Sequence, residues 1–327
     1  MKKIQLIIFL ICVINIFAFS QEIIYVKADG NDNNSGLSET EALKTLYRAL
    51  SRAEQLNSGR ITVLGTLDAK SEARNTRDSV FELSVNSDRE ILITGKPNAS
   101  DSEKAILSAK DSNKSIISVS KGNIRFEHIE ISNANGEGTG AVGVYVFSRM
   151  TLGQGAVVRD NSSFGILISG FNAIFTLDGG EVRKNNSCAV FVSKGLFILN
   201  NGTISDNKAE LGAGVFVGTD SMFEMHGGTI ENNTADSGAG VLVDANGKFE
   251  MYGGTITNNI ADSGAGVIIF GKGIFEMSGG TITKNRATNI VGGVWVLKGG
   301  KFVQNRKAKV TGNNAKRTNP NPNVYRQ

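Results

Sequence analysis

The chain has 327 residues, of which 39 are glycine and only 3 are proline, and 40% are hydrophobic. This much hydrophobic material, including 17 phenylalanines, is not typical of a disordered protein. The formal net charge of +4 falls to +2 without Lys2 and Lys3, so the overall charge does not indicate nucleic-acid binding. Because Cys12 lies in the leader described next, Cys188 stands alone, and an intrachain disulfide is excluded.

Residues 1–20 have the form of a secretory signal peptide. Lys2 and Lys3 give a positive start, residues 4–19 are almost wholly apolar, and small residues favour cleavage after Ser20. The alternative is a membrane anchor, but the run is short for a bilayer span, which needs about 20 residues. We therefore expect an exported protein with no transmembrane segment after cleavage. It would be secreted, at the cell surface in association with the outer membrane, or in the periplasm.

Residues 21–120 predict an N-terminal cap followed by irregular first coils. An amphipathic helix is expected over residues 39–55, because Leu43, Leu46 and Leu50 fall on one side of it. Such a helix can cover the open mouth of a first coil. The short strands predicted after it span residues 60–64, 80–85, 90–94, 105–108, 115–119 and 124–131.

Residues 121–315 carry a regular repeat. Phe223, Phe249 and Phe275 are 26 residues apart, and each begins a Phe-Glu-Met triplet. Short β-prone segments bounded by glycine flank each triplet, such as residues 241–243 and 255–256. Three short strands separated by tight turns describe one coil of a solenoid, and no helix of ten residues fits within the repeat.

We therefore predict an all-β fold, a single-stranded right-handed parallel β-helix with three short strands per coil and an N-terminal amphipathic capping helix. One coil cannot bury enough surface to be stable alone, so many coils and capped ends are required. Residues 316–327 contain Asn-Pro-Asn-Pro and predict a polar C-terminal tail. The interior is expected to hold a stack of side chains, formed by Phe175, Phe197, Phe223, Phe249, Phe275 and Phe302, with Met150 in the same column.

A column of asparagines supports this coil assignment. One asparagine follows the third strand of each coil, at spacings between 22 and 28 residues. Asparagine tolerates left-handed backbone and bonds neighbouring backbone groups, and its amides can bond along the column when coils stack. The predicted ladder consists of Asn133, Asn161, Asn185, Asn207, Asn233, Asn259, Asn285 and Asn313.

Residues 140–313 resemble the pectin-lyase-like right-handed β-helix superfamily. Within them, Gly-Gly-Thr-Ile at 227–230, 253–256 and 279–282 resembles the repeats of bacterial polymorphic outer-membrane proteins and related surface proteins. The Phe-x-x-Asn motif at 197–200 and 302–305 matches the same repeats. This resemblance implies a bacterial surface protein, and the wider superfamily also includes polysaccharide lyases and hydrolases.

Enzymes of this fold place acidic and basic side chains in an outer groove, and one column here offers such groups. Asp160, Lys184 and Asp206 each precede a ladder asparagine. The two aspartates would lie two coils apart, about 9–10 Å by strand spacing. That is the upper edge of the separation in inverting glycosidases, roughly 6.5–9.5 Å. Against catalysis, Lys184 lies between the two aspartates, and Asp before Asn is an ordinary turn pair.

Two acidic columns raise the question of a metal. Glu224, Glu250 and Glu276 are outward residues of three stacked strands, and Glu210, Asp236 and Asp262 form a second column in a turn. Like charges opposite one another on strands are destabilising, and a cation would relieve them. The hypothesis is weak calcium binding or docking of a basic partner, and the alternative is a solvated face. No other cofactor is expected.

The preferred function from sequence is a non-catalytic exported scaffold for adhesion or binding, with an unknown surface protein or polysaccharide as partner. Export and regular coils without a convergent acid, base or metal set support this interpretation. The alternative is a carbohydrate-active enzyme, a polysaccharide lyase or glycoside hydrolase, acting on acidic polysaccharide. A purely structural spacer of the envelope is a third option.

Overall fold

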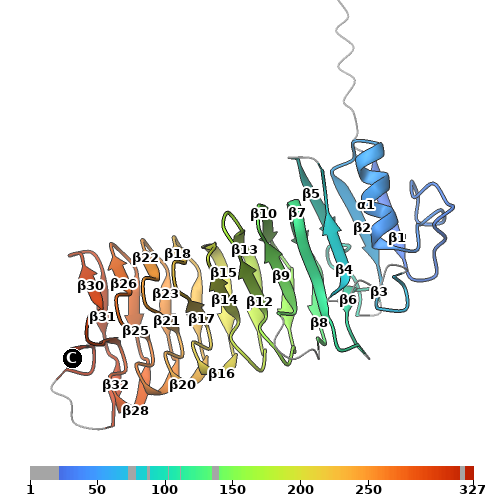
Figure 1. The fold of residues 1–327 in the computed structure, drawn as a ribbon. Coiled ribbons are helices and arrows are strands. Elements are labelled where there is room, and N and C mark those ends of the chain that lie inside the picture. The colour runs from blue at the N-terminus through green and yellow to red at the C-terminus, as the bar shows by residue number, and fades with distance from the viewer. Residues whose placement is uncertain are drawn as a thin grey trace, which may run out of the picture.

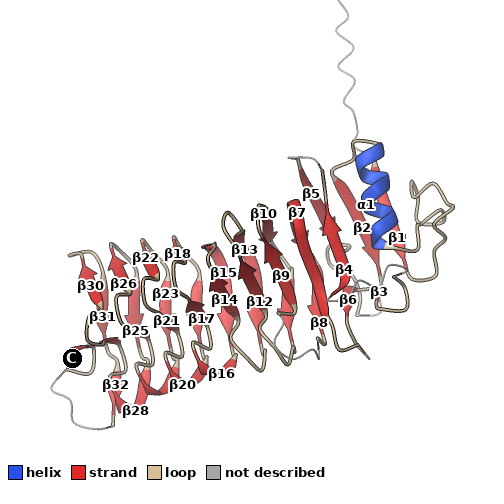
Figure 2. Ribbon diagram, in the orientation of Figure 1, coloured by secondary structure: helices blue, strands red, loops and turns tan. Residues whose placement is uncertain are grey.

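The computed structural model describes residues 22–72, 79–86, 89–101, 103–110, 112–134, 140–316 and 321–327. Within these ranges the chain is an elongated parallel β-solenoid with one helix (Figures 1 and 2). The predicted all-β parallel β-helix with an N-terminal helix is therefore confirmed. The predicted signal peptide lies outside the described residues.

Helix α1 (Leu46–Gln55) packs against β1 (Ile23–Lys27) and β2 (Arg60–Leu64) at one end of the solenoid (Figure 1). Its buried residues, Leu46, Ala49, Leu50 and Ala53, join the main hydrophobic core, as a capping helix requires. The helix is shorter than the 39–55 predicted because Thr45 is its N-cap and accepts a hydrogen bond from the Arg48 backbone N–H at 3.1 Å. The preceding residues form a turn, in which the Lys44 and Thr45 N–H groups both donate to Asp32 at 2.9 Å.

Three stacks of parallel strands form the faces of the tube. The first face contains the phenylalanine column, the second leads to the asparagines, and the third follows them. The first face consists of β1, β2, β5 (Glu90–Thr94), the end of β7 (Ser115–Glu127), β10 (Ser148–Leu152), the starts of β13 (Ile174–Arg183) and β15 (Leu196–Ser205), β18 (Met222–Met225), β22 (Lys248–Met251), β26 (Ile274–Met277) and β30 (Lys301–Gln304).

The other two faces pair in the same parallel manner. The second face consists of β3 (Thr66–Leu67), β6 (Ala105–Ser108), β8 (Ile129–Ser132), β11 (Val157–Arg159), the ends of β13 and β15, β19 (Thr229–Glu231), β23 (Thr255–Thr257), β27 (Thr281–Thr283) and β31 (Lys309–Thr311). The third face consists of β4 (Ser79–Ser84), the start of β7, β9 (Val142–Tyr145), β12 (Ile166–Ser169), β14 (Val190–Ser193), β17 (Val215–Val217), β21 (Val241–Val243), β25 (Val267–Ile269), β29 (Val294–Val296) and β33 (Val324–Arg326).

A fourth short strand appears in the later coils, which three strands per coil did not anticipate. It builds a separate five-stranded side sheet from β16 (Lys208–Leu211), β20 (Thr234–Ser237), β24 (Ile260–Ser263), β28 (Arg286–Ile290) and β32 (Asn314–Ala315). Its inner surface is a small cluster of buried alanines, including Ala235, Ala261 and Ala287. Only a small side chain fits there, since the side sheet folds close against the tube.

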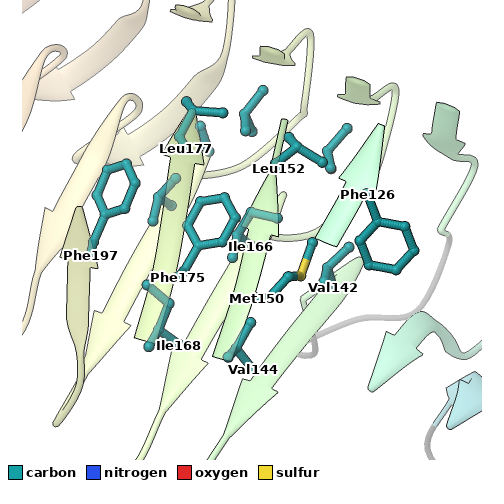
Figure 3. Packing of buried hydrophobic residues seen from close by; sticks show 14 of the residues in the cluster. Phe126, Val142, Val144, Met150, Leu152, Ile166, Ile168, Phe175, Leu177 and Phe197 are labelled. Atoms are coloured by element: carbon teal, nitrogen blue, oxygen red, sulfur yellow. The ribbon is translucent and has the colours of Figure 1, made fainter. Parts of the chain in front are cut away.

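The core is a continuous column of side chains along the axis. Phe175 and Phe197 stack with ring centroids 5.4 Å apart, and Phe223 and Phe249 with centroids 4.6 Å apart (Figure 3 shows the first of these pairs). The column continues to Phe302, and its members from Phe175 to Phe275 are completely buried. Met150 lies in register between Ile124 and Phe175, so the column extends toward the cap with aliphatic residues.

The C-terminal residues add a strand instead of a polar tail. Val324 pairs with Val294, and Arg326 pairs with Val296, so β33 extends the third face by one layer. Residues 317–320 lie outside the described residues. Proline and asparagine in this segment suggested a tail, but Val324 and Tyr325 alternate as an edge strand does.

Candidate functional site

Buried asparagines join the coils through a continuous hydrogen-bond ladder between the second face and the side sheet. Asn233 donates from its backbone N and from Nδ2 to Oδ1 of Asn259, both at 3.0 Å. Asn259 bonds Asn285 in the same way, at 3.0 and 2.9 Å. The residues joined in this way are Asn161, Asn185, Asn207, Asn233, Asn259, Asn285, Asn313 and Asn323.

Asn133 is not a member of this ladder, which corrects the sequence prediction. It is exposed with a φ of 68°, and the next residue, Ala134, instead donates its N–H to Asn161 Oδ1 at 2.8 Å. Asn133 thus occupies the left-handed turn position that precedes each ladder residue. At the other end of the ladder, Asn323 extends the column beyond Asn313, which sequence spacing did not reveal because it follows a proline-rich stretch.

The three candidate catalytic residues occupy this same left-handed turn position. Asp160, Lys184 and Asp206 have φ values of 54°, 55° and 58°, and all three are exposed. The equivalent position in later coils holds Asn232, Asn258 and Lys284 with similar φ values. Because the backbone, and not one side-chain chemistry, sets the conformation at this position, the column does not select a catalytic group.

The contacts of the trio point away from a shared active centre. Asp160 forms an ion pair with its neighbour Arg159, and Arg159 also bonds Glu130 at 2.9 Å. Within the described residues, no ion pair or side-chain hydrogen bond joins Asp160, Lys184 and Asp206 to one another. The structure therefore places the trio in one column without bringing the side chains together.

A polar cleft that sequence reasoning missed lies beside Asp160. Its lining includes Lys96, His128, Glu130, Arg159 and Arg183, which come from the loop after β5, the turn after β7, and strands β8, β11 and β13. Arg159 holds Glu130, while Arg183 holds Glu181 at 2.7 Å, so the charges in and around the cleft are mostly paired. This cleft can hold a small polar ligand, and the turn that positions His128 has a left-handed φ of 48°.

Side chains of the chain itself neutralise the glutamate column of the first face. Lys248 forms ion pairs with Glu250 and, at 3.3 Å, with Glu276. Tyr252 Oη donates to Glu250 at 2.7 Å, and His226 Nε2 lies 3.2 Å from Glu224. The Lys248 ammonium and the Tyr252 hydroxyl lower the pKa of Glu250. The repulsion that suggested a bound cation is thus relieved within the chain.

The second acidic column lies on strands of the side sheet and not in a turn. Glu210, Asp236 and Asp262 are exposed residues of β16, β20 and β24. Asp262 accepts a hydrogen bond from Oγ1 of Thr288 in the next strand. Among the described residues, no group of three or more His, Cys, Asp or Glu side chains converges as metal ligands. Weak calcium binding remains a prediction.

An aromatic step marks the place where the side sheet begins. Phe164 and Phe191 stack on the outside of the tube with centroids 5.0 Å apart, and Phe216 meets Phe191 edge-on at 5.0 Å. With Leu211, which is 46% exposed, they line a shallow groove next to the edge strand β16. In later coils the side sheet covers the same column. The apolar residue in the middle of Val-Phe-Val at 190–192 and 215–217 was the available sequence signal.

Cys188 lines the same groove but is itself a buried core residue. Burial raises the pKa of its thiol to about 12, and Sγ bonds the Val190 carbonyl at 3.1 Å. A thiol in this state is not a nucleophile, because the reactive form is the thiolate.

No family model, curated protein or solved structure that was compared matches this chain. The parallel β-solenoid thus stands on the structure itself, and the resemblance to pectin-lyase-like and outer-membrane repeat proteins remains a prediction. Across the described residues, none of the helical structure is long and apolar enough to cross a bilayer.

Proposed function

We propose that the protein is an exported, non-catalytic β-helix that serves as a binding scaffold at the cell surface. Its partner would be a surface protein or a polysaccharide, and its repeats would be those of the bacterial outer-membrane proteins that they resemble. The alternatives for its location are secretion or the periplasm. The leader at residues 1–20 supports export, because its positive start, apolar run and small residues are what a signal peptidase requires.

The observation that carries the non-catalytic part of this proposal is the pairing of outward carboxylates with neighbours in the chain. Glu250 is held by Lys248 and Tyr252, and Asp160 is held by Arg159. A general acid or base needs a side chain free to reach the proton it transfers, and these carboxylates are already engaged. A solenoid that repeats the same side chain in each coil instead offers an extended surface to an extended partner.

Protease accessibility on intact cells tests the surface location. A tagged full-length chain should be cleaved by external protease, while a variant that lacks residues 2–20 should remain protected inside the cell. If the full-length chain is cleaved only after the outer membrane is opened, the protein is periplasmic and the surface assignment is wrong.

The second candidate function is a carbohydrate-active enzyme, and the polar cleft beside Asp160 favours it. Glu130 in this cleft is the carboxylate nearest to His128 in sequence, and Arg159 holds it at 2.9 Å. The purified protein should be screened for release of reducing sugar or unsaturated product from acidic polysaccharides. Activity that disappears in Glu130→Gln, Asp160→Ala or Asp206→Ala would replace the scaffold proposal with the enzyme.

A further inference from the structure

Charge is strongly segregated along the axis of this protein, although the whole chain is nearly balanced. Residues 203–276 contain ten acidic and three basic residues, a net charge of −7. Residues 277–327 contain ten Lys and Arg and no Asp or Glu, a net charge of +10. The overall value of +4 therefore conceals one acidic and one basic region, which follow each other directly.

The basic residues surround the C-terminal end of the tube, far from helix α1 (Figure 1). They lie on strands of the first, second and third faces, on the side sheet and in the turns between them. All nine that the structure describes are exposed. We call them the basic end, which consists of Lys284, Arg286, Lys298, Lys301, Arg306, Lys307, Lys309, Lys316 and Arg326.

The cations of the basic end have no acidic partner within the described residues, where none of the nine forms an ion pair. The nearest carboxylate in the sequence, Glu276, is already paired with Lys248 at 3.3 Å. Only Arg326 has a side-chain contact of note, with its guanidinium 5.6 Å from the centre of the Phe302 ring. The positive charge is therefore available to an external anion.

These charges act together because the coils are thin. Successive coils are about 4.8 Å apart, and the Debye length at physiological salt is about 8 Å. The charges of the last two coils thus lie within one to two Debye lengths along the axis. Their summed field attracts a polyanion and speeds its association.

We infer that the basic end binds an acidic polysaccharide through its repeated carboxylate or sulfate groups. The inference rests on the proposed binding function and names the chemistry of its partner. A single small anion would need converging donors, whereas these cations are distributed around the tube. Six of the nine are lysines, whose flexible point charges suit a polymer with many anions better than one planar group.

Other anionic partners fit the basic end less well. Binding to a lipid surface uses apolar side chains that project beside the cations, and Val303 is the exposed large hydrophobic residue described after Glu276. Single-stranded nucleic acid stacks on exposed aromatic rings, while Trp295 and Tyr325 are half-buried. A second copy would have to use the acidic region, where Glu250 and Glu276 are already paired with Lys248.

The test measures binding of the full mature chain to immobilised polygalacturonate, with the uncharged polymer dextran for comparison. The apparent affinity for polygalacturonate should fall about tenfold or more between about 50 and about 200 mM sodium chloride, because the interaction is ionic. Dextran should not be retained. A triple variant, Lys301→Glu, Arg306→Glu and Lys309→Glu, should weaken binding about tenfold or more, since it reverses three exposed charges.

A matched variant controls for net charge. Lys44→Glu, Lys70→Glu and Lys110→Glu reverse the same number of exposed charges in the N-terminal half and should change the affinity less than about twofold. Both triple variants should keep the circular dichroism and melting temperature of the parent. Equal losses in the two variants would show that net charge and not the basic end controls binding, and would overturn the inference.

Further outcomes distinguish this inference from the proposed function. Tighter binding to phosphatidylglycerol vesicles or to single-stranded DNA than to polygalacturonate would overturn it in favour of those partners. A dimer in sedimentation equilibrium that the first triple variant dissociates would assign the basic end to self-association. A surface-exposed protein that does not bind polygalacturonate would retain the scaffold function but lose this partner, whereas a protein confined to the cytoplasm would lose the scaffold function itself.

Discussion

Oδ1 of Asn259 accepts two hydrogen bonds from Asn233, one from the backbone N and one from Nδ2, both at 3.0 Å. The Asn259 amide in turn donates to the Ile230 carbonyl and to Asn285 Oδ1. One side chain therefore satisfies buried groups in two neighbouring coils at once. This reciprocity explains why asparagine, with an acceptor and two donors on one planar group, recurs at the position.

Asn259→Ala should destabilise the protein strongly. The substitution leaves the Asn233 N–H and amide without an acceptor in a buried site, and each such group costs about 1–3 kcal/mol. We expect the free energy of unfolding in urea to fall by roughly 2–5 kcal/mol. Asn258→Gly is the control, because Asn258 is exposed and its φ of 55° suits glycine. A control that costs as much as Asn259→Ala would contradict the structural role of the ladder.

Phe249→Ala should also be costly, through loss of packing. The ring lies between Phe223 and Phe275, with centroids 4.6 and 4.5 Å away, and is completely buried. Removing a buried phenylalanine ring typically costs about 3–5 kcal/mol. Phe147→Ala is the comparison, since Phe147 is 71% exposed, and it should lower the melting temperature little. Similar melting temperatures for the two variants would mean that the stacked rings do not support the fold.

Lys248→Met should expose the repulsion within the glutamate column. Without the ammonium, Glu250 and Glu276 face each other uncompensated, so we expect a loss on the order of 1 kcal/mol at low salt. Calcium should raise the melting temperature of the variant and leave that of the parent unchanged. Lys272→Met, in an exposed turn, is the control. A parent protein that calcium stabilises as much as the variant would show that Lys248 does not take the place of a metal.

Glu72 should make stability depend on pH near neutrality. Burial raises the pKa of its carboxyl from 4.5 to about 7, against the effect of hydrogen bonds from the Leu46 and Tyr47 N–H groups at the start of α1. Between these values the folded chain binds more protons than the unfolded chain. The free energy of unfolding therefore falls as pH rises through this window, by up to about 3 kcal/mol.

Urea titrations at intervals from pH 5 to pH 8 measure this effect. Glu72→Gln cannot ionise, so its midpoint should exceed that of the parent at pH 8 and approach it at pH 5. Glu82→Gln, which alters an exposed carboxyl nearby, should follow the parent curve. If Glu72→Gln followed the parent curve across the range, the carboxyl would not be the group responsible.

The architecture was predictable because its main determinants recur at a fixed interval. Phe223, Phe249 and Phe275 are 26 residues apart, and stacking is the arrangement that buries all three. Strands at 60–64, 90–94 and 105–108 have the predicted bounds. Prediction was weaker where a tertiary contact decides, as at the start of α1, where Asp32 binds the preceding backbone.

The candidate site was less accessible to prediction from sequence. Which turn residue becomes the ladder residue depends on the backbone conformation, so Asn133 was mistaken for a member while Asn323 was missed. The order of residues places Asp160, Lys184 and Asp206 in one column, but only the structure shows where their side chains are engaged. The cleft around His128 joins residues from five separate segments, which no local pattern can indicate.

The side-by-side pairing of each strand with the equivalent strand of the next coil has a mechanical consequence. Every β16-to-β20 or β22-to-β26 ladder holds one coil to its neighbour, so no bond spans the tube from end to end. A pull on the C-terminus would oppose only the outermost coil at any moment. The chain would extend in steps of equal length at nearly constant force, as a reel releases thread, and the remaining coils would keep their shape.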